Sequence, residues 1–574
     1  MAILVAITPS SVLVLVSKIL GLVALVQLLR FVWWLVNLLF ILPRFDPLRR
    51  VPGPDGKKFE NHFKEMGDPD VSPEEYDKWS KKYGKTWRYQ GFGSFDYRLL
   101  SLDLRAISYI LNSEVYEKPL MTRRMITRLV GKGVFATEGA EHKALRKLIA
   151  PAFTSKAIRA LNPIFFQKAD ELRSIWDDII SSTPQSHTCD TTGDEKVCSE
   201  TSSGEPEAVI DVFHWLSRLT FDVIGLAGFD YPFHALRDET EEVYSAYRHM
   251  FSAIEKCGGI MTILYLQFPI LEKLFPNASI RQRNASLRAI RKSGKTLIDG
   301  KKAALLAEKA SAKEIQEKDL LSLLLKANLS EDPSQQLPDS DILDQLSNFL
   351  FAGSDSTTLA ISWCLHYLSL NPEIQHRLRD ELLTLSPSSA SSASSNESAD
   401  SSVEIEALSY LEAVIKETLR VVPPAHGTLR FATRDDLIPL SHPIITPSGE
   451  EMMEIKIRKG SFVHIPLEGL NLSKDIWGED AHEFKPDRWF NLPATARQHP
   501  GLANLMSFSF GPHACPGWRF SIVETKIVLA TVIPQFVFEP ATKIGKYASI
   551  VTRPFVDNQF NWSLPLKVSK YQDC

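Results

Sequence analysis

The chain has 574 residues, of which 44% are hydrophobic, and a formal net charge of −4. This slightly acidic balance gives no support to nucleic-acid binding, which depends on basic surfaces. Six cysteines are too few for a disulfide framework, so the composition indicates a large buried core in a reducing compartment.

The N-terminal stretch, residues 3–42, is almost continuously apolar. A helix needs about 20 such residues to cross the hydrocarbon core of a bilayer, so at least one membrane span fits here. Three arginines follow, and by the positive-inside rule they place the body of the protein on the cytoplasmic side: Arg44, Arg49 and Arg50. No small-residue cleavage site is present, which favours an uncleaved anchor over a signal peptide. Residues 1–50 are therefore predicted to be a membrane anchor and hinge. The sequence is consistent with one membrane span and also with a span followed by an interfacial helix.

The remainder, residues 51–574, is predicted to form one domain. Residues 87–92 and 97–101 have the composition of two short strands, and helical patterns dominate beyond them. Residues 181–207 and 386–402 are rich in serine and other small or acidic residues, which predicts exposed flexible insertions and not domain boundaries. The predicted fold class is mainly α with a small β subdomain.

Residues 341–370 have the length and apolar periodicity of a long buried helix. In its middle, Gly353 and the hydroxyl residues around it weaken the helix and can bend it. A bend without catalytic role and a groove beside a bound cofactor both explain this composition.

Two shorter stretches place charged side chains on one helical face. His142 and Arg146 are four residues apart, a spacing that alone favours a solvated amphipathic helix. Glu417 and Arg420 are three apart among apolar neighbours, which indicates partial burial. Exposed pairs at this spacing are common and contribute little to stability.

Near the C-terminus, Cys515 lies among glycines and prolines in a tight loop that precedes a helical run from Trp518 to Ala530. A thiolate binds soft or borderline metals, and glycines at 511 and 517 allow a flat macrocycle to approach the backbone. A buried free cysteine beside a tight turn is the alternative interpretation.

The pattern Phe-x-x-Gly-x-His-x-Cys-x-Gly, from Phe508 to Gly517, resembles the haem-binding loop of the cytochrome P450 family. The resemblance covers about residues 50–570, with four family motifs in the family's order. It implies haem b with Cys515 as its axial ligand, held between the long oxygen-binding helix and the helix that follows the cysteine. The family usually has arginine where this chain has His513, so the charge at that haem propionate contact is expected to depend on pH.

The resemblance also assigns roles to the other motif residues. The expected cofactor-binding residues are His142, Arg146, Arg430, Phe508, His513 and Gly517. In the oxygen-activation motif, Asp355 matches the family's acid and Ser356 replaces its first threonine, so these two residues are expected to deliver protons to dioxygen, with Thr357 following them. A buried structural triad is expected from Glu417, Arg420 and Arg488.

The implied function is that of a haem-thiolate monooxygenase of fungal, microsomal type. It would insert one atom of O2 into a hydrophobic substrate, such as a terpenoid or another secondary metabolite. Electrons would come from NADPH through a separate NADPH–cytochrome P450 reductase, with cytochrome b5 as a second candidate donor and Lys143 and Lys147 as the candidate docking patch. The chain would be anchored in the endoplasmic reticulum membrane with its catalytic domain in the cytosol, and residues 261–276 would either contact the lipid or be plain core.

Family substrate contacts correspond to four stretches that are expected to be mainly apolar: 121–134, 349–352, 424–428 and 549–552. Two other functions remain open. One is a haem-thiolate isomerase or dehydratase that acts on a peroxide, and the other is a non-enzymatic haem-binding membrane protein. The acid and hydroxyls at 355–357 argue against the isomerase.

Overall fold

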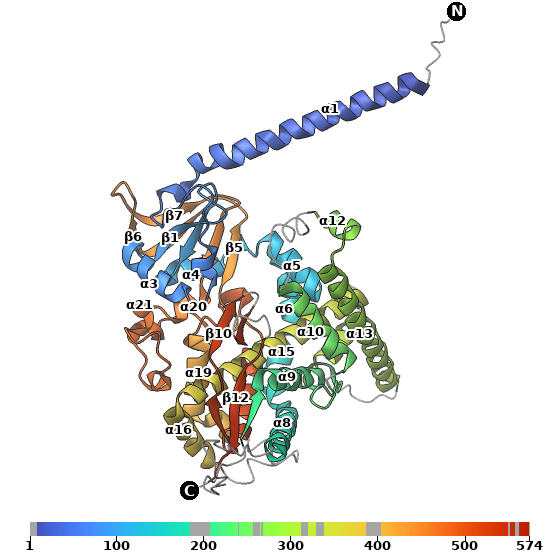
Figure 1. Cartoon of the computed structure of the whole chain (residues 1–574), viewed down its shortest axis with the longest axis vertical. Helices are drawn as coiled ribbons and strands as arrows, with labels where there is room; N and C mark the ends of the chain where they lie inside the picture. The colour runs from blue at the N-terminus through green and yellow to red at the C-terminus, as the bar shows by residue number, and fades with distance from the viewer. Residues whose placement is uncertain are drawn as a thin grey trace, which may run out of the picture.

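The computed structural model describes residues 9–183, 207–238, 240–255, 265, 268–310, 319–328, 338–385, 403–548, 551–556 and 562–572. The predicted insertions at 181–207 and 386–402 fall almost wholly outside these residues, as do residues 549 and 550 and most of 261–267. Helix α1 (Pro9–Val36) projects from the body (Figure 1). Within the described part of the chain, one stretch, Ser17–Phe45, has the length and apolar composition needed to cross a membrane.

The body is built mainly from helices, as the apolar periodicity predicts. Its longer helices are α3 (Ser72–Tyr83), α4 (Leu104–Asn112), α5 (Leu120–Val130), α6 (Gly139–Ile149), α8 (Asn162–Ser182), α9 (Val212–Phe229), α10 (Glu242–Glu255), α13 (Ala278–Ala310), α14 (Leu320–Asn328), α15 (Asp339–Leu370), α16 (Pro372–Leu383), α19 (Ser409–Val421) and α23 (Trp518–Val532). Shorter helices are α2 (Phe63–Gly67), α7 (Ser155–Arg159), α12 (Pro269–Leu274), α20 (Leu467–Asn471), α21 (Lys474–Trp477) and α22 (Ala494–Arg497).

The strands form small sheets. The largest has the order β1-β2-β8-β5-β3, from β1 (Thr86–Gln90), β2 (Tyr97–Ser101), β8 (Phe462–Ile465), β5 (Thr428–Ala432) and β3 (Tyr116–Glu117). The others pair β6 (Asp436–Ile445) with β7 (Glu451–Ile457), β10 (Ile544–Ala548) with β11 (Thr552–Val556), and β12 (Pro565–Lys570) with both β4 (Glu207–Asp211) and β9 (Phe536–Pro540). The first predicted strand ends at Gln90 and not at Phe92, because the chain turns there and the Gly91 N–H donates to the Asp96 carbonyl at 2.8 Å.

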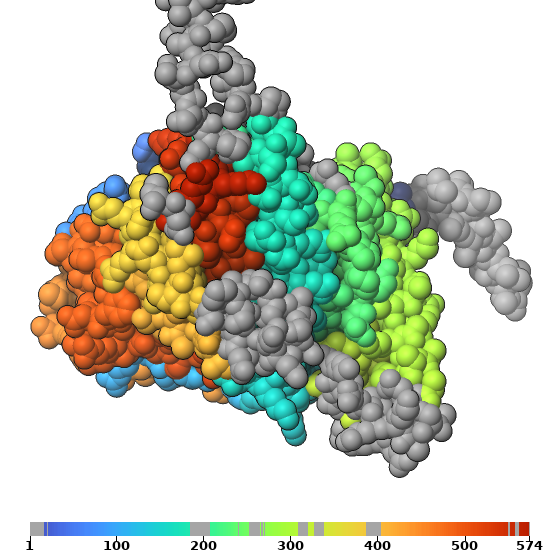
Figure 2. Space-filling view, turned by 90° about the horizontal axis from the view of Figure 1, so that it is seen from below, coloured from blue at the N-terminus to red at the C-terminus, as the bar shows by residue number. Residues whose placement is uncertain are grey.

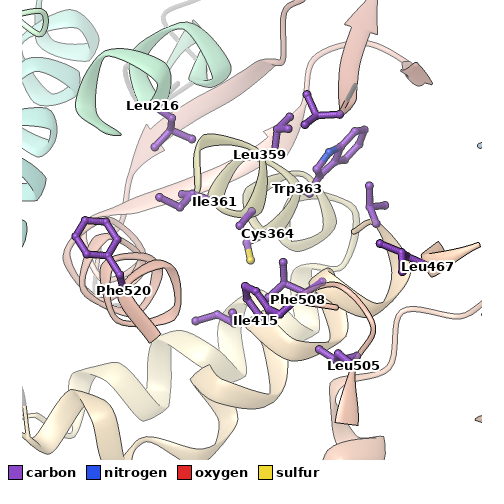
Figure 3. Packing of buried hydrophobic residues seen from close by; sticks show 14 of the residues in the cluster. Leu216, Leu359, Ile361, Trp363, Cys364, Ile415, Leu467, Leu505, Phe508 and Phe520 are labelled. Atoms are coloured by element: carbon purple, nitrogen blue, oxygen red, sulfur yellow. The ribbon is translucent and has the colours of Figure 1, made fainter. Parts of the chain in front are cut away.

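Helix α15 runs through the middle of the molecule, where it contacts α9, α19 and α23 (Figure 1). Its buried side chains pack against Phe520 of α23, Ile415 of α19 and the Phe508 end of the cysteine loop (Figure 3). The C-terminal strands lie between α16 and α8 on the face seen in Figure 2. This packing places the predicted oxygen motif and the cysteine loop in one core.

Gly353 explains how α15 and α9 approach so closely. A Cβ atom at residue 353 would lie 2.6 Å from the Ile224 side chain of α9, closer than van der Waals contact allows. The helix is continuous through this glycine, from Asp339 to Leu370. The glycine therefore serves helix packing here, in addition to weakening the helix as the sequence predicts.

Candidate active site

The cysteine loop is fixed by its own backbone. The Cys515 N–H donates to the Phe508 carbonyl at 2.8 Å, which closes the loop just before α23 begins. Gly511 adopts a positive φ of 72°, and a Cβ there would lie 2.8 Å from the Asn112 side chain, so the turn requires glycine. Gly517 has a φ of −87°, and a Cβ there would meet only Phe153 at an ordinary 3.5 Å, so the protein packing alone does not require this glycine. Its role in the approach of a macrocycle stays a prediction.

The Cys515 thiol, the predicted iron ligand, is half-buried. Burial raises its pKa to about 11, against the opposing effects of a backbone hydrogen bond from Gly517 and the positive charge of Arg146. The thiol therefore keeps its proton at neutral pH until a metal displaces it. The second cysteine in the described residues, Cys364, lies inside α15 with its sulfur 3.3 Å from the Thr418 hydroxyl, in the apolar packing of Figure 3.

Two arginines near the loop, Arg430 and Arg146, show whether the residues present would fit haem. Arg430 is buried on β5, where its Nη1 donates only to neutral oxygens, Thr428 Oγ1 at 2.7 Å and the Leu429 carbonyl at 3.0 Å. Burial lowers the pKa of Arg430, and burial likewise lowers the pKa of Arg146. Neither guanidinium forms an ion pair with a carboxylate within the described residues, although the charge of Glu138 acts on Arg430 and Arg146 is only half-buried. Burying a cation without a close anion is unfavourable. Haem propionates would supply those anions, so the residues present fit the cofactor.

His513 and His142 lie together, with ring centroids 4.0 Å apart. Lys118 Nζ is 3.2 Å from His513 Nδ1, and Glu138 Oε2 is 2.9 Å from His513 Nε2. An ammonium group can only donate, so Nδ1 accepts and Nε2–H donates to Glu138, which makes His513 neutral. Burial also lowers the pKa of His513. Burial, with the positive charge of Lys118 nearby, lowers the pKa of His142 to about 4.

Lys118 and Glu138 were not identified from the sequence. Lys118 Nζ lies 2.8 Å from Glu138 Oε1. Burial by itself would raise the pKa of Glu138, but His513 and Lys118 together lower it to about 2. Lys118 therefore adds a cation beside His513, although burial lowers the pKa of Lys118. The expected pH-dependence at His513 stays a prediction.

The three residues of the oxygen motif have three different partners. The Asp355 carboxylate contacts the Arg553 guanidinium of β11, and burial raises the pKa of Asp355. Ser356 Oγ donates to the Ala352 carbonyl, four residues earlier, at 2.7 Å. Thr357 Oγ1 donates to Ser521 Oγ of α23 at 3.1 Å. Thr357 therefore faces the cysteine-loop helix, and its hydroxyl cannot replace that of Ser356 without rotation.

Glu417 lies at the centre of a buried charge network on α19. Arg420 meets it with two hydrogen bonds of 2.8 Å, and Arg488 Nε lies 3.0 Å from Glu417 Oε1. Two further donors reach the same carboxylate, the Trp489 indole at 3.0 Å and the Lys485 backbone N–H at 2.8 Å. The structure thus brings the three predicted triad residues together and attaches the 485–489 segment to α19.

The structure describes the second half of the predicted lipid-contacting segment, residues 268–276, which includes α12. Phe268, Ile270, Leu274 and Phe275 are all exposed there. Glu272 of the same helix is paired with Arg128 of α5 at 3.3 Å, so α12 is tied to the stretch 121–134. That stretch also carries Arg123 and Arg124, so the expectation that it is mainly apolar is wrong for α5.

Comparison with known proteins gives consistent matches. The family model described as Cytochrome P450 matches residues 51–549. The chain is 37% identical to Cytochrome P450 monooxygenase 205 of Postia placenta over 94% of this chain and 96% of that protein. It is 31% identical to Cytochrome P450 monooxygenase claP of Ampulloclitocybe clavipes over 94% of this chain and 97% of that protein. The crystal structure of a cytochrome P450 (CYP102L1) matches with a TM-score of 0.65 and 22% identity, over 91% of this chain and all of that one, which supports the same fold.

Proposed function

The chain belongs to the cytochrome P450 family and is a monooxygenase of that family, and we propose that it oxidises a hydrophobic small molecule with electrons from NADPH. The observation that carries this proposal is the cysteine loop, where Arg146 acts on Cys515 and Arg430 acts on His513, and neither arginine forms an ion pair with a carboxylate among the described residues. The same arrangement fits haem b bound through the Cys515 thiolate.

When bound, haem would supply oxygen activation, and a thiolate ligand favours O–O cleavage. The residues of the chain contribute the rest. Cys515 would hold the iron, and Arg146 and Arg430 would neutralise the propionates. Asp355 and Ser356 move protons to the oxygen site, and the buried interior around α15 excludes bulk water.

An aromatic cluster supports a hydrophobic substrate. Phe351, within the oxygen-site segment of α15, stacks on Phe251 of α10 with ring centroids 4.9 Å apart and lies 6.4 Å from Phe135. The similar relatives are fungal, so a terpenoid or another secondary metabolite is the class we propose. The experiment that identifies it is a metabolite comparison between host cells expressing the active chain and cells expressing Cys515→Ala.

The electron donor we propose is an NADPH–cytochrome P450 reductase, with cytochrome b5 as a second donor. Lys143 and Lys147 are exposed on α6, the helix that also carries His142 and Arg146. A reductase docked on these lysines would be close to the propionate end of the site. Long-range attraction of this kind weakens as salt is added.

We expect the N-terminal stretch to be an endoplasmic reticulum anchor that the chemistry does not require. Deleting residues 1–44 spares Leu48 and Val51, the first fully buried side chains of the body, so the truncated chain should fold and bind haem. Membrane fractionation should show the full chain in membranes and the truncated chain largely released, with residual binding through α12. A full-length chain found entirely in the soluble fraction would contradict the anchor.

The proton relay gives a test of the monooxygenase chemistry itself. Ser356→Ala should raise the hydrogen peroxide released per NADPH consumed, with haem content unchanged, because protons arrive more slowly at the oxygen site. Ser356→Thr should release no more hydrogen peroxide per NADPH than the wild type, since the branched threonine side chain restricts the rotamer of the hydroxyl. Asp355→Asn should slow turnover more than either, because it removes the titratable group.

Ser347→Ala is the matched control for the relay. Ser347 lies on the same helix, and its hydroxyl also bonds to the carbonyl four residues earlier, at 3.2 Å from the Leu343 oxygen. Ser347→Ala should leave the hydrogen peroxide released per NADPH unchanged. If Ser356→Ala and Asp355→Asn behave like this control, the relay is wrong and an isomerase that does not use dioxygen becomes the better account.

A further inference from the structure

Asp355 of the oxygen motif is paired with an arginine that lies 198 residues further along the chain. The side chains of Arg553 and Asp355 are only 5% and 10% exposed, and their guanidinium and carboxylate groups are in direct contact. Removing one partner of such a pair leaves a buried charge without compensation. The pairing therefore makes the position and charge of Asp355 depend on a residue outside α15.

Arg553 is itself held in one orientation. Its guanidinium carbon lies 4.2 Å from the centroid of the Trp562 ring. Its backbone pairs with Tyr547 in the β10–β11 hairpin, and Trp562 forms an isolated bridge with Phe555 of β11. A stacked guanidinium with a fixed backbone loses little conformational freedom when it binds a carboxylate. Arg553 is therefore suited to hold the Asp355 carboxylate in one position.

The residue before Arg553 connects the hairpin to the proposed substrate site. The Thr552 N–H donates to the Pro424 carbonyl at 2.8 Å. The Thr552 carbonyl accepts from the Trp363 indole of α15 at 3.2 Å. Pro424 begins the proposed substrate stretch 424–428, so a ligand that moves this stretch acts on the backbone adjacent to Arg553.

The other groups near Asp355 cannot substitute for Arg553. Tyr247 and Arg248 of α10 lie close enough to interact electrostatically with Asp355, and Ser354 Oγ donates to Tyr247 at 3.3 Å. Burial raises the pKa of Asp355, while Arg553 and then Arg248 oppose that rise. Of the two arginines, only Arg553 forms an ion pair with the carboxylate within the described residues.

We propose that Arg553 is a positioning residue that holds Asp355 in its proton-delivering arrangement and links it, through Thr552 and Pro424, to occupation of the substrate site. This inference rests on the proposed role of Asp355 in the relay. It predicts that Arg553 affects coupling through Asp355 and not through haem binding.

The test uses the full-length, haem-loaded chain with reductase and with farnesol as the hydrophobic probe. Arg553→Gln should raise hydrogen peroxide per NADPH several-fold, and Arg553→Lys, which keeps the charge, should restore part of the coupling. In the Asp355→Asn background, Arg553→Gln should add nothing further. Arg377→Gln is the control, because Arg377 also pairs with an aspartate and lies 4.0 Å from an aromatic ring, but at the surface.

A second readout does not depend on turnover. Amide hydrogen exchange in residues 544–556 should increase in Asp355→Asn, since the hairpin loses its ion pair with α15 and keeps the Trp363 hydrogen bond, and should stay at the wild-type level in Ser356→Ala. Unchanged exchange in Asp355→Asn, or an Arg553→Gln effect that adds fully to that of Asp355→Asn, overturns the inference. Normal coupling in Asp355→Asn together with increased exchange would refute the relay but leave the Arg553 link intact.

Discussion

Replacing Glu417 with alanine is expected to give a chain that no longer folds stably or retains haem. Glu417 is fully buried and compensates the guanidinium groups of Arg420 and Arg488. Its removal leaves both cations buried without their common anion, at a cost of about 3–5 kcal/mol. Whole domains are stable by only about 5–15 kcal/mol, so this loss removes much of the total. Haem content and urea unfolding of the purified chain measure it.

Glu412→Ala is the matched control for Glu417→Ala. Glu412 lies on the same helix and forms ion pairs with Lys416 and Lys526, but its side chain is 39% exposed. Glu412→Ala should lower the free energy of unfolding far less than Glu417→Ala does. The effects of Glu417→Ala and Arg488→Ala should also be strongly non-additive, because each destroys the same network. A Glu417→Ala chain with full haem content and only slower turnover would show that the network is catalytic and not structural.

Replacing Cys515 with alanine is expected to abolish NADPH-dependent oxidation completely. No other cysteine in the described residues is placed to substitute, because burial raises the pKa of Cys364 to about 12 and its thiol is enclosed between α15 and α19. Product formation and NADPH consumption with reductase are the measurements. Cys364→Ala, the control, should remain active, and activity retained by Cys515→Ala would end the haem-thiolate account.

The parts of the molecule that could be predicted from the sequence are those with local patterns. The helix predicted at 341–370 is α15, since its apolar residues recur with helical spacing over its whole length. Glu417 and Arg420 share one face of α19 for the same reason. The mainly helical fold with small sheets is confirmed by the family and structure matches.

The parts that could not be predicted are contacts between residues far apart in the chain. Lys118 is 395 residues from His513, and Arg553 is 198 residues from Asp355, so no local spacing reveals either pair. The direction of Thr357 toward Ser521 depends on how α15 packs on α23, which the sequence pattern does not specify. These tertiary contacts determine how the side chains of the cysteine loop and of α15 are paired.

The most direct measurement of the central claim is the absorption spectrum of the reduced, carbon-monoxide-bound wild-type chain, compared with Cys515→His. A thiolate ligand from Cys515 predicts the red-shifted Soret band of thiolate haem in the wild type. It predicts the loss of that band, with haem still bound, when histidine supplies the ligand. A wild-type spectrum without the shifted band, or a shifted band that survives in Cys515→His, would contradict the haem-thiolate site on which the proposed oxidation depends.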